Sequence, residues 1–167
     1  LFKEAKLGGV NVIHVTIAYW ENKKEVLQNI NTWNNQFTEH ADLIMPIRDA
    51  EDITIAQDND KIGIIFGFQN CSPIEDDVSL IEEMHQLGAR IMQLSYNNQS
   101  LLATGCYEEK DSGITRFGKV AIKEMNRLGM IIDMSHSAEF STLQAMDISS
   151  RPIAITHANP TTFHAAI

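Results

Sequence analysis

The sequence predicts an α/β protein built as part of a (β/α)8 TIM-like barrel. Apolar runs of strand length alternate with amphipathic stretches of helical length, and the pair Leu-Gly recurs at three of the joints. Strands that alternate with helices form right-handed βαβ units, which give a parallel sheet. No G-x-G-x-x-G or Walker sequence follows a strand, so an open nucleotide-binding sheet lacks its usual signature. A barrel needs ~250 residues, so we expect this chain to hold about five of the eight βα units.

Five apolar runs predict the strands. They are nearly continuous rather than strictly alternating, which is typical of strands that are buried on both faces of a parallel sheet. The predicted strands are residues 10–18, 62–68, 89–95, 130–133 and 152–156.

Amphipathic stretches predict the helices at 76–87, 116–128 and 139–148; the last places Phe140, Leu143 and Met146 on one side. Residues 21–61 begin with a helix-like sequence and continue with polar residues, so we expect a helix followed by a loop. Glycine in "KLGGV", "QLGAR" and "RLGMI" suits the left-handed residue that closes a helix, which assigns this conformation to Gly8, Gly88 and Gly129.

The composition excludes some partners. The chain carries 22 acidic and 13 basic residues, for a net charge of −9, and its Lys and Arg residues do not cluster. Nucleic-acid binding is therefore not expected, because neutralising phosphates requires clustered basic residues. No apolar run approaches the ~18–20 residues that span a bilayer.

The cysteines and the ends of the chain bear on its context. Cys71 and Cys106 make no disulfide framework and slightly favour a cytoplasmic location. The sequence starts at Leu1 and stops at Ile167 in the middle of a polar turn. We therefore expect residues 1–167 to be a piece of a longer protein and part of a single barrel domain.

Polar residues follow the predicted strands, at the edge where parallel α/β proteins place their chemistry. These strand ends are Gln69-Asn70, Tyr96-Asn97-Asn98, Asp133 to His136, and His157-Ala158-Asn159. One histidine after a strand is more often a solvated or capping residue than a ligand. Two at successive strand ends make ligation about as probable as not, because imidazole is a common ligand of zinc. Asp133 would either orient an imidazole or cap the following helix.

Other reactive side chains have simpler interpretations. Ser135 has no G-x-S-x-G elbow around it, so it is not expected to be a nucleophile. Cys106 is expected to be an ordinary loop cysteine rather than a reactive thiol. His14 lies inside the first strand, where a satisfied histidine in the core or barrel interior is expected. No role is assigned to His40, His85 and His164.

Four stretches together resemble one known family, the membrane (renal-type) dipeptidases of peptidase family M19. They are "GFQNCSPIEDD", "ARIMQLSYNNQSLLATGCYE", "DSGITRFGKVAIKEMNRLGMIIDMSH" and "RPIAITHANP", and the likeness runs from about Gly8 to the end of the chain. The resemblance implies a barrel of the metal-dependent hydrolase type with one or two Zn²⁺ ions. It also implies cleavage of dipeptides by metal-bound hydroxide, and some members open β-lactams.

The resemblance assigns roles to individual residues. His136 and His157 would bind one metal ion, with Asp133 and Asn159 in supporting positions. Gln69 stands where the family has a bridging glutamate, and it would be a weak ligand or a water-positioning group. Tyr96 stands where the family has a histidine, and its phenol would donate a hydrogen bond to the reacting carbonyl. The family's remaining ligands are expected before Leu1 and after Ile167.

Three functions follow from this resemblance. The first is a metal-dependent dipeptidase, and the second is a single-metal hydrolase that acts on another small amide or a lactam. The third is a non-catalytic relative kept for binding. The partner is then a small dipeptide or amide, and a homodimer is possible. The isolated chain is expected to be inactive and poorly soluble or oligomeric, because a partial barrel leaves two open sheet edges.

Overall fold

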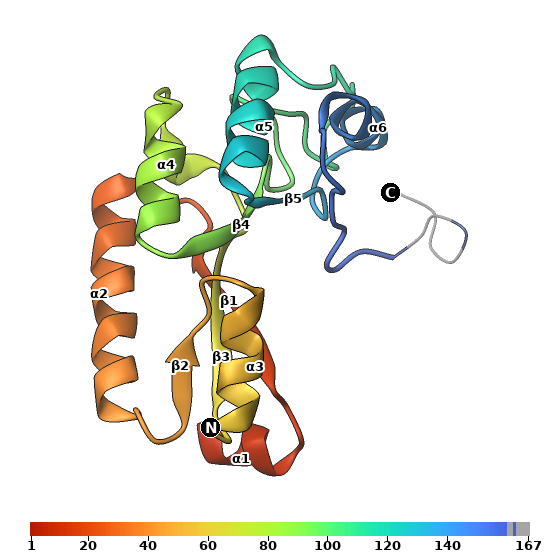
Figure 1. The fold of residues 1–167 in the computed structure, drawn as a ribbon. Coiled ribbons are helices and arrows are strands. Elements are labelled where there is room, and N and C mark those ends of the chain that lie inside the picture. Colours follow the sequence, from red (N-terminus) through yellow and green to blue (C-terminus); the bar gives the residue numbers. More distant parts are fainter. Residues whose placement is uncertain (160–161, 163–167) are drawn as a thin grey trace.

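The computed structural model describes residues 1–159 and residue 162, which form one parallel sheet flanked by helices (Figure 1). The strands are β1 (Val12–Ala18), β2 (Ile44–Pro46), β3 (Ile62–Phe68), β4 (Ala89–Gln93) and β5 (Ile131–Asp133). The helices are α1 (Phe2–Leu7), α2 (Lys23–Glu39), α3 (Ala50–Asp58), α4 (Ser79–Gln86), α5 (Arg116–Leu128) and α6 (Glu139–Ile148), with a 3-10 turn at Ser72–Ile74. The predicted α/β class with a parallel sheet is confirmed. No helix in the described part of the chain is both long and apolar enough to cross a membrane.

The central strand of the sheet is β3. It pairs with β1 along one side, and on its other side it pairs with β2 over its first half and with β4 over its second half. β5 continues the sheet beyond β4, so the order is β1-β3-β4-β5. All these pairings are parallel, so the carboxyl ends of the strands lie at one edge of the sheet.

The two faces of the sheet have different surroundings. The Phe66 ring packs against α2, with its centroid 5.8 Å from that of Phe37 and 6.0 Å from that of Trp33. Ile65, the preceding residue, lies on the opposite face and lines a cavity together with Ile53 of α3. We call this second face, the one opposite α2, the interior face.

The loop predicted for the end of residues 21–61 is wrong, because the structure places β2 and α3 there. Asp49 caps the start of helix α3, because its carboxylate accepts hydrogen bonds from the backbone N–H groups of Glu51 and Asp52. The Asp52 side chain accepts in return from the Asp49 backbone. This reciprocal cap satisfies free backbone N–H groups at the start of α3. The helix is short and acidic, and its apolar pattern is too weak to predict a helix from the sequence.

The prediction of a strand over the whole of residues 152–156 is also wrong. Only Ala154 pairs with the sheet: its N–H donates to the Ile132 carbonyl at 2.8 Å, and its carbonyl accepts from Met134 at 2.9 Å. Pro152 has no N–H to donate. The backbone N–H of Thr156 donates to the Ser135 hydroxyl rather than to a strand. The segment therefore touches the sheet at one residue and is then held by side chains.

The predicted glycine conformations are confirmed at two of the three joints. Gly129 and Gly88 have φ values of 76° and 111°. Gly8 has a φ of −78°, so the prediction is wrong there, and the next residue, Gly9, takes the left-handed position with φ 77°. The chain needs one such residue to turn from α1 toward β1, and the second glycine supplies it.

The apolar sides predicted for α4 and α5 are buried, at Ile81, Met84, Ala121 and Met125. The predicted helix 139–148 is confirmed as α6, on which Phe140, Leu143 and Met146 are exposed while Ser141 and Ala145 are buried. Asp111 holds the start of this helix: its carboxylate accepts hydrogen bonds from the backbone N–H groups of Phe140 and Ser141 and from the Ser141 hydroxyl. A polar contact therefore fixes the start of α6.

Candidate metal site

Two histidines meet at the carboxyl edge of the sheet. His136 follows β5, and His157 follows the residue that bridges to β5. Their Nε2 atoms lie 2.9 Å apart, and their ring centroids lie 4.9 Å apart. The structure thus brings together two side chains that are separated by about twenty residues in the sequence.

The neighbours of each ring determine where its proton lies. The Nδ1 atom of His136 is 2.7 Å from the amide oxygen of Asn97, which only accepts, so this nitrogen carries the hydrogen. The Nδ1 atom of His157 is 2.8 Å from the Thr156 hydroxyl, whose single hydrogen goes to Asp133. His157 must therefore also donate from Nδ1. Both Nε2 atoms are left with a lone pair.

Two lone pairs that face each other at 2.9 Å repel unless a proton or a cation lies between them. Metal–nitrogen bonds are ~2.0–2.1 Å long, so two ligand nitrogens of one tetrahedral ion lie ~3.3 Å apart. The pair therefore fits two ligands of a single metal ion. Among the residues that the structure describes, no group of three or more His, Cys, Asp or Glu side chains is placed to hold a metal. Two imidazoles are thus the contribution of this part of the chain.

Asp133 lies beneath the histidines and is fully buried. Its carboxylate accepts hydrogen bonds from Gln93 Nε2 at 3.0 Å, from the Ser135 hydroxyl at 2.5 Å and from the Thr156 hydroxyl at 2.6 Å. Burial acts to raise the pKa of Asp133, but these hydrogen bonds outweigh it and hold the pKa below its ordinary value. The Ser135 hydrogen is bound to Asp133, so this hydroxyl acts as a donor that positions the carboxylate.

The pKa of His136 also favours the form that binds metals. Partial burial lowers it, and the neighbouring His157 lowers it further, against a smaller opposing effect of Asp133. A lowered pKa keeps the imidazole neutral near pH 7, and the neutral ring is the one that binds a metal ion.

The other predicted site residues lie at different distances from this pair. The Tyr96 ring packs on the His136 ring, with the centroids 4.4 Å apart and the planes 36° apart. Gln69 follows β3, where its side-chain N–H donates to the Thr16 hydroxyl at 2.8 Å. Asn159 is exposed. In the described part of the chain, neither Gln69 nor Asn159 forms a hydrogen bond with a histidine.

His14 differs from the expectation of a satisfied histidine. It pairs in register with Ile65, and its Nε2 atom is buried with no hydrogen-bond partner among the described residues. Burial lowers its pKa; Asp133 raises it and His157 lowers it, so both groups lie within electrostatic reach. A Cβ on Gly67 would lie 1.8 Å from this Nε2 atom, so the imidazole occupies the space that the glycine leaves free.

Sequence reasoning named Asn97 among the polar strand ends without giving it a role, and it missed Thr156 as a site residue. Both accept the Nδ1 hydrogens of the histidines. Their positions in the sequence could have indicated that they lie near the histidines, since Asn97 follows β4 and Thr156 directly precedes His157. Cys106 is exposed, and partial burial raises the pKa of its thiol, in keeping with an ordinary loop cysteine. His40 and His85 lie at the end of α2 and within α4, away from the site, and His164 lies outside the described residues.

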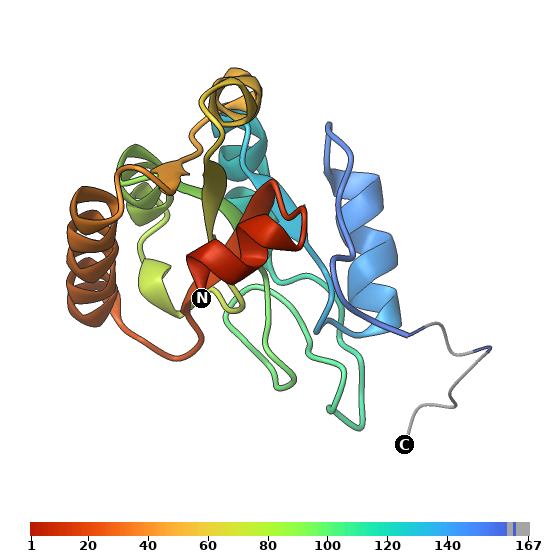
Figure 2. The same cartoon turned by 90° about the horizontal axis from the view of Figure 1, so that it is seen from below.

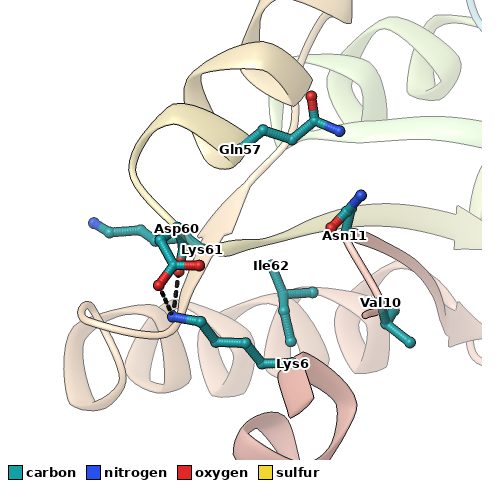
Figure 3. A pocket seen from close by; sticks show the side chains of 7 residues that line it. All are labelled: Lys6, Val10, Asn11, Gln57, Asp60, Lys61 and Ile62. Carbon is teal, nitrogen blue, oxygen red and sulfur yellow. Dashed lines mark hydrogen bonds and ion pairs between the residues drawn. The ribbon is translucent and has the colours of Figure 1, made fainter. Parts of the chain in front are cut away.

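A cavity of about 280 Å³ at the opposite edge of the sheet is not part of this site (Figure 3). It lies between α1, the end of α3 and the start of β3, and the ion pair between Lys6 Nζ and Asp60 Oδ2, 2.7 Å long, crosses it. Figure 2 shows α1 in the foreground at this end of the molecule. Parallel α/β proteins carry their chemistry at the carboxyl ends of the strands, where the two histidines lie.

Comparison with known proteins gives a consistent result. A family model described as membrane dipeptidase (peptidase family M19) matches residues 3–166. A dipeptidase of Schizosaccharomyces pombe described as uncharacterized is 29% identical over 117 residues, which are 66% of this chain and 28% of the relative. A dipeptidase of Claviceps purpurea is 24% identical over 138 residues, 81% of this chain and 32% of the relative.

The structural matches extend over almost the whole chain. The crystal structure of an amidohydrolase from Pseudomonas aeruginosa superposes with a TM-score of 0.96 and 34% identity, over 99% of this chain and 50% of that one. A probable dipeptidase from the same organism superposes with a TM-score of 0.87 and 20% identity, over 96% of this chain and 46% of that one. The chain thus spans about half the length of these solved structures and about a third or less of the curated relatives.

Proposed function

Because the chain belongs to the membrane dipeptidase family, peptidase family M19, we propose that the protein containing it is a metal-dependent hydrolase of dipeptides. The observation that carries the proposal is the pair of Nε2 lone pairs that converge at 2.9 Å. The family implies a divalent metal, and we propose Zn²⁺, because neutral imidazoles are preferred ligands of this ion. The similarity to an amidohydrolase at 34% identity supports an amide as the bond that is cleaved.

A bound Zn²⁺ ion supplies a Lewis acid and lowers the pKa of a water molecule. The residues of this chain hold and orient it. His136 and His157 bind through Nε2, while Asn97 and Thr156 hold the Nδ1 hydrogens and thereby fix both ring orientations. Tyr96, next to His136, donates its phenol hydrogen to the oxygen that becomes negative during the reaction.

The position of Gln69 favours a second candidate, a single-metal hydrolase of another small amide or a lactam. A neutral amide cannot supply the negative charge that holds two dications close together. Gln69 also donates its N–H to Thr16, which leaves its amide oxygen as a weak ligand or as a group that positions water. In this version the site binds one ion rather than two.

The test uses the full-length protein loaded with zinc, cobalt or manganese. We expect hydrolysis of some members of a dipeptide panel, and we expect His157→Ala to lose both bound metal and more than about 99% of the activity, beyond the ~10–100-fold effect of removing a supporting residue. A metal content of one ion per chain with activity only on N-acyl amino acids or lactams would favour the second candidate. Full metal occupancy with no hydrolysis of any substrate would contradict both and indicate a non-catalytic relative.

A further inference from the structure

An open cavity of about 530 Å³ lies beside the candidate metal site, where β1 leads into α2. Three aromatic side chains and two carboxylates line it, namely Tyr19, Trp20, Tyr96, Glu21 and Glu25. None of these residues belongs to the metal-binding pair, but Tyr96 connects the two places because its ring packs on the His136 imidazole at 4.4 Å. A group bound in the cavity is therefore adjacent to the metal site.

The aromatic rings form the walls of this cavity. The rings of Tyr19 and Trp20 both meet Tyr96 edge to face, with centroid distances of 5.7 Å and 5.6 Å and interplanar angles of 79° and 90°. Trp20 is 61% exposed, so its ring is open to a ligand that arrives from the solvent. The negative faces of aromatic rings attract organic cations within about 6 Å of the ring centroid.

The charge of the cavity points to the same kind of ligand. One oxygen of Glu21 accepts hydrogen bonds from the backbone N–H groups of Tyr19 and Trp20, at 2.6 Å and 3.0 Å, and so holds the two aromatic residues in place. One oxygen of Glu25 caps α2 by accepting from the Asn22 backbone at 2.9 Å. Each carboxylate keeps its other oxygen for a ligand, and no basic side chain among the described residues lines the cavity.

We propose that the cavity formed by Tyr19, Trp20, Tyr96, Glu21 and Glu25 binds a positively charged organic group of the substrate, an ammonium or a guanidinium. This inference rests on the proposed function, because it makes the cavity a specificity subsite of that hydrolase. It goes beyond that function by naming the substrate class: small amides with a basic side chain next to the bond that is cleaved.

The experiment compares pairs of dipeptides that differ by one charge, glycyl-lysine with glycyl-norleucine and lysyl-glycine with norleucyl-glycine, on the full-length metal-loaded protein. We expect kcat/KM to favour the lysine member of at least one pair by about 5- to 30-fold, the range for a partly desolvated cation on aromatic rings. The double variant Glu21→Gln/Glu25→Gln should bring this preference close to one, while the norleucine substrates change little. Glutamine serves a capping box as well as glutamate does, so the start of α2 is kept.

Glu39→Gln is the matched control, because it removes one carboxylate from the other end of the same helix, about 21 Å away at 1.5 Å per residue. It should leave the preference unchanged. An equal response to Glu39→Gln, or no preference for lysine in either pair, would overturn the proposal.

A readout without catalysis separates this proposal from the proposed function. Lysyl-glycine bound in the cavity should change the fluorescence of Trp20, and Trp20→Phe should abolish this change; the norleucine analogue should produce less of it. If the protein cleaves no dipeptide but Trp20 reports saturable binding of the lysine peptide, the cavity assignment stands and the hydrolase assignment fails. If dipeptides are cleaved without any charge preference, the reverse holds.

Discussion

The two ends of the interior face differ in how far their polar groups are satisfied. Around β5, Asp133 accepts hydrogen bonds from three side chains, and both histidines have a partner at Nδ1. Around β1 and β3, the buried His14 Nε2 has no partner among the described residues, and Gln69 makes one side-chain hydrogen bond. Side chains of this chain therefore hold Asp133 and both histidines of the β5 half, although Gln93 Oε1 is buried there without a partner among the described residues. In the β1–β3 half, neither His14 nor Gln69 is held by a comparable set of hydrogen bonds within the described part of the chain.

The contrast indicates which side chains of the site are fixed before a ligand binds. The hydrogen bonds at both Nδ1 atoms fix the ring orientations of the histidines, so binding of the proposed metal ion would cost little reorganisation. Within the described residues the β1–β3 half has no such network, so its side chains are free to adapt to a second ion, a water molecule or substrate. The contrast predicts large effects for substitutions in the β5 half. Substitutions in the β1–β3 half should have smaller effects, which alter the number of bound ions or local packing.

The largest effect is expected for Asp133→Asn. The amide would turn an N–H group toward donors that now point at a carboxylate, and we expect the free energy of unfolding to fall by about 3 kcal/mol, the upper range for hydrogen bonds to a charged group. Urea denaturation of the full-length protein measures it. Asp111→Asn, at the start of α6, is a matched control, because it also removes hydrogen bonds to a carboxylate. It should lower the free energy of unfolding as well, but it should leave metal affinity unchanged.

The same variant should change the pH dependence of stability. Because the pKa of Asp133 is lower in the folded than in the unfolded protein, the carboxylate stabilises the fold at pH values above its unfolded pKa of ~3.9. This contribution is lost as the pH falls through the folded pKa. The difference in unfolding free energy between the wild type and Asp133→Asn should thus be constant at neutral pH and shrink below about pH 4. A difference that grows in acid would contradict this account.

Thr156→Val is expected to have the next largest effect. It keeps the shape of the side chain but removes the hydroxyl that donates to Asp133 and accepts from His157. Loss of such a supporting hydrogen bond weakens metal binding by about 10- to 100-fold. Thr156→Ser keeps the hydroxyl and should retain most of the affinity. Competition with a chelating dye measures both variants, and equal affinities would show that the hydroxyl does not position the ring.

Gln69→Glu tests the adaptable half of the site. A carboxylate at this position adds a charged ligand, and we expect a second divalent ion to bind at least about tenfold more tightly than in the wild type. Metal analysis of the dialysed protein measures the number of ions per chain. Gln57→Glu adds the same charge at the opposite edge of the sheet, beside Asp60, and should not change that number.

The parts of the fold that the sequence could predict are those with strong local patterns. The apolar run at 62–68 coincides with β3 in full, and the amphipathic stretch at 116–128 coincides with α5 in full. A buried strand and a strongly amphipathic helix each impose a clear pattern on the sequence. β2 has only three residues, and α3 is held by its reciprocal cap, so neither has a periodicity to detect. The contact that holds the start of α6 comes from the distant Asp111, and no local pattern reveals it.

The candidate site shows the same limit. The histidines and Asp133 could be selected because polar residues after buried strands stand out in the sequence. The roles of Asn97 and Thr156 could not, since they depend on which ring nitrogen each one faces, and the folded chain alone determines this. Nor could the missing partner of His14 be foreseen, because burial without a hydrogen bond depends on the packing of β1 against Gly67 of β3.

The smallest effect on metal binding is expected for Gly67→Ala, which examines that packing directly. The new Cβ would lie 1.8 Å from His14 Nε2, so the imidazole must move, at a cost of about 1–3 kcal/mol in unfolding free energy. In a His14→Ala background the space is free, and the same substitution should cost less than about 0.5 kcal/mol, so a double-mutant cycle measures the coupling. Gly63→Ala is the control, because its Cβ meets Ile47 at 2.6 Å and its cost should not depend on residue 14. Additive effects of Gly67→Ala and His14→Ala would mean that the imidazole does not occupy this space, and the contrast between the two halves of the interior face would then rest on Gln69 alone.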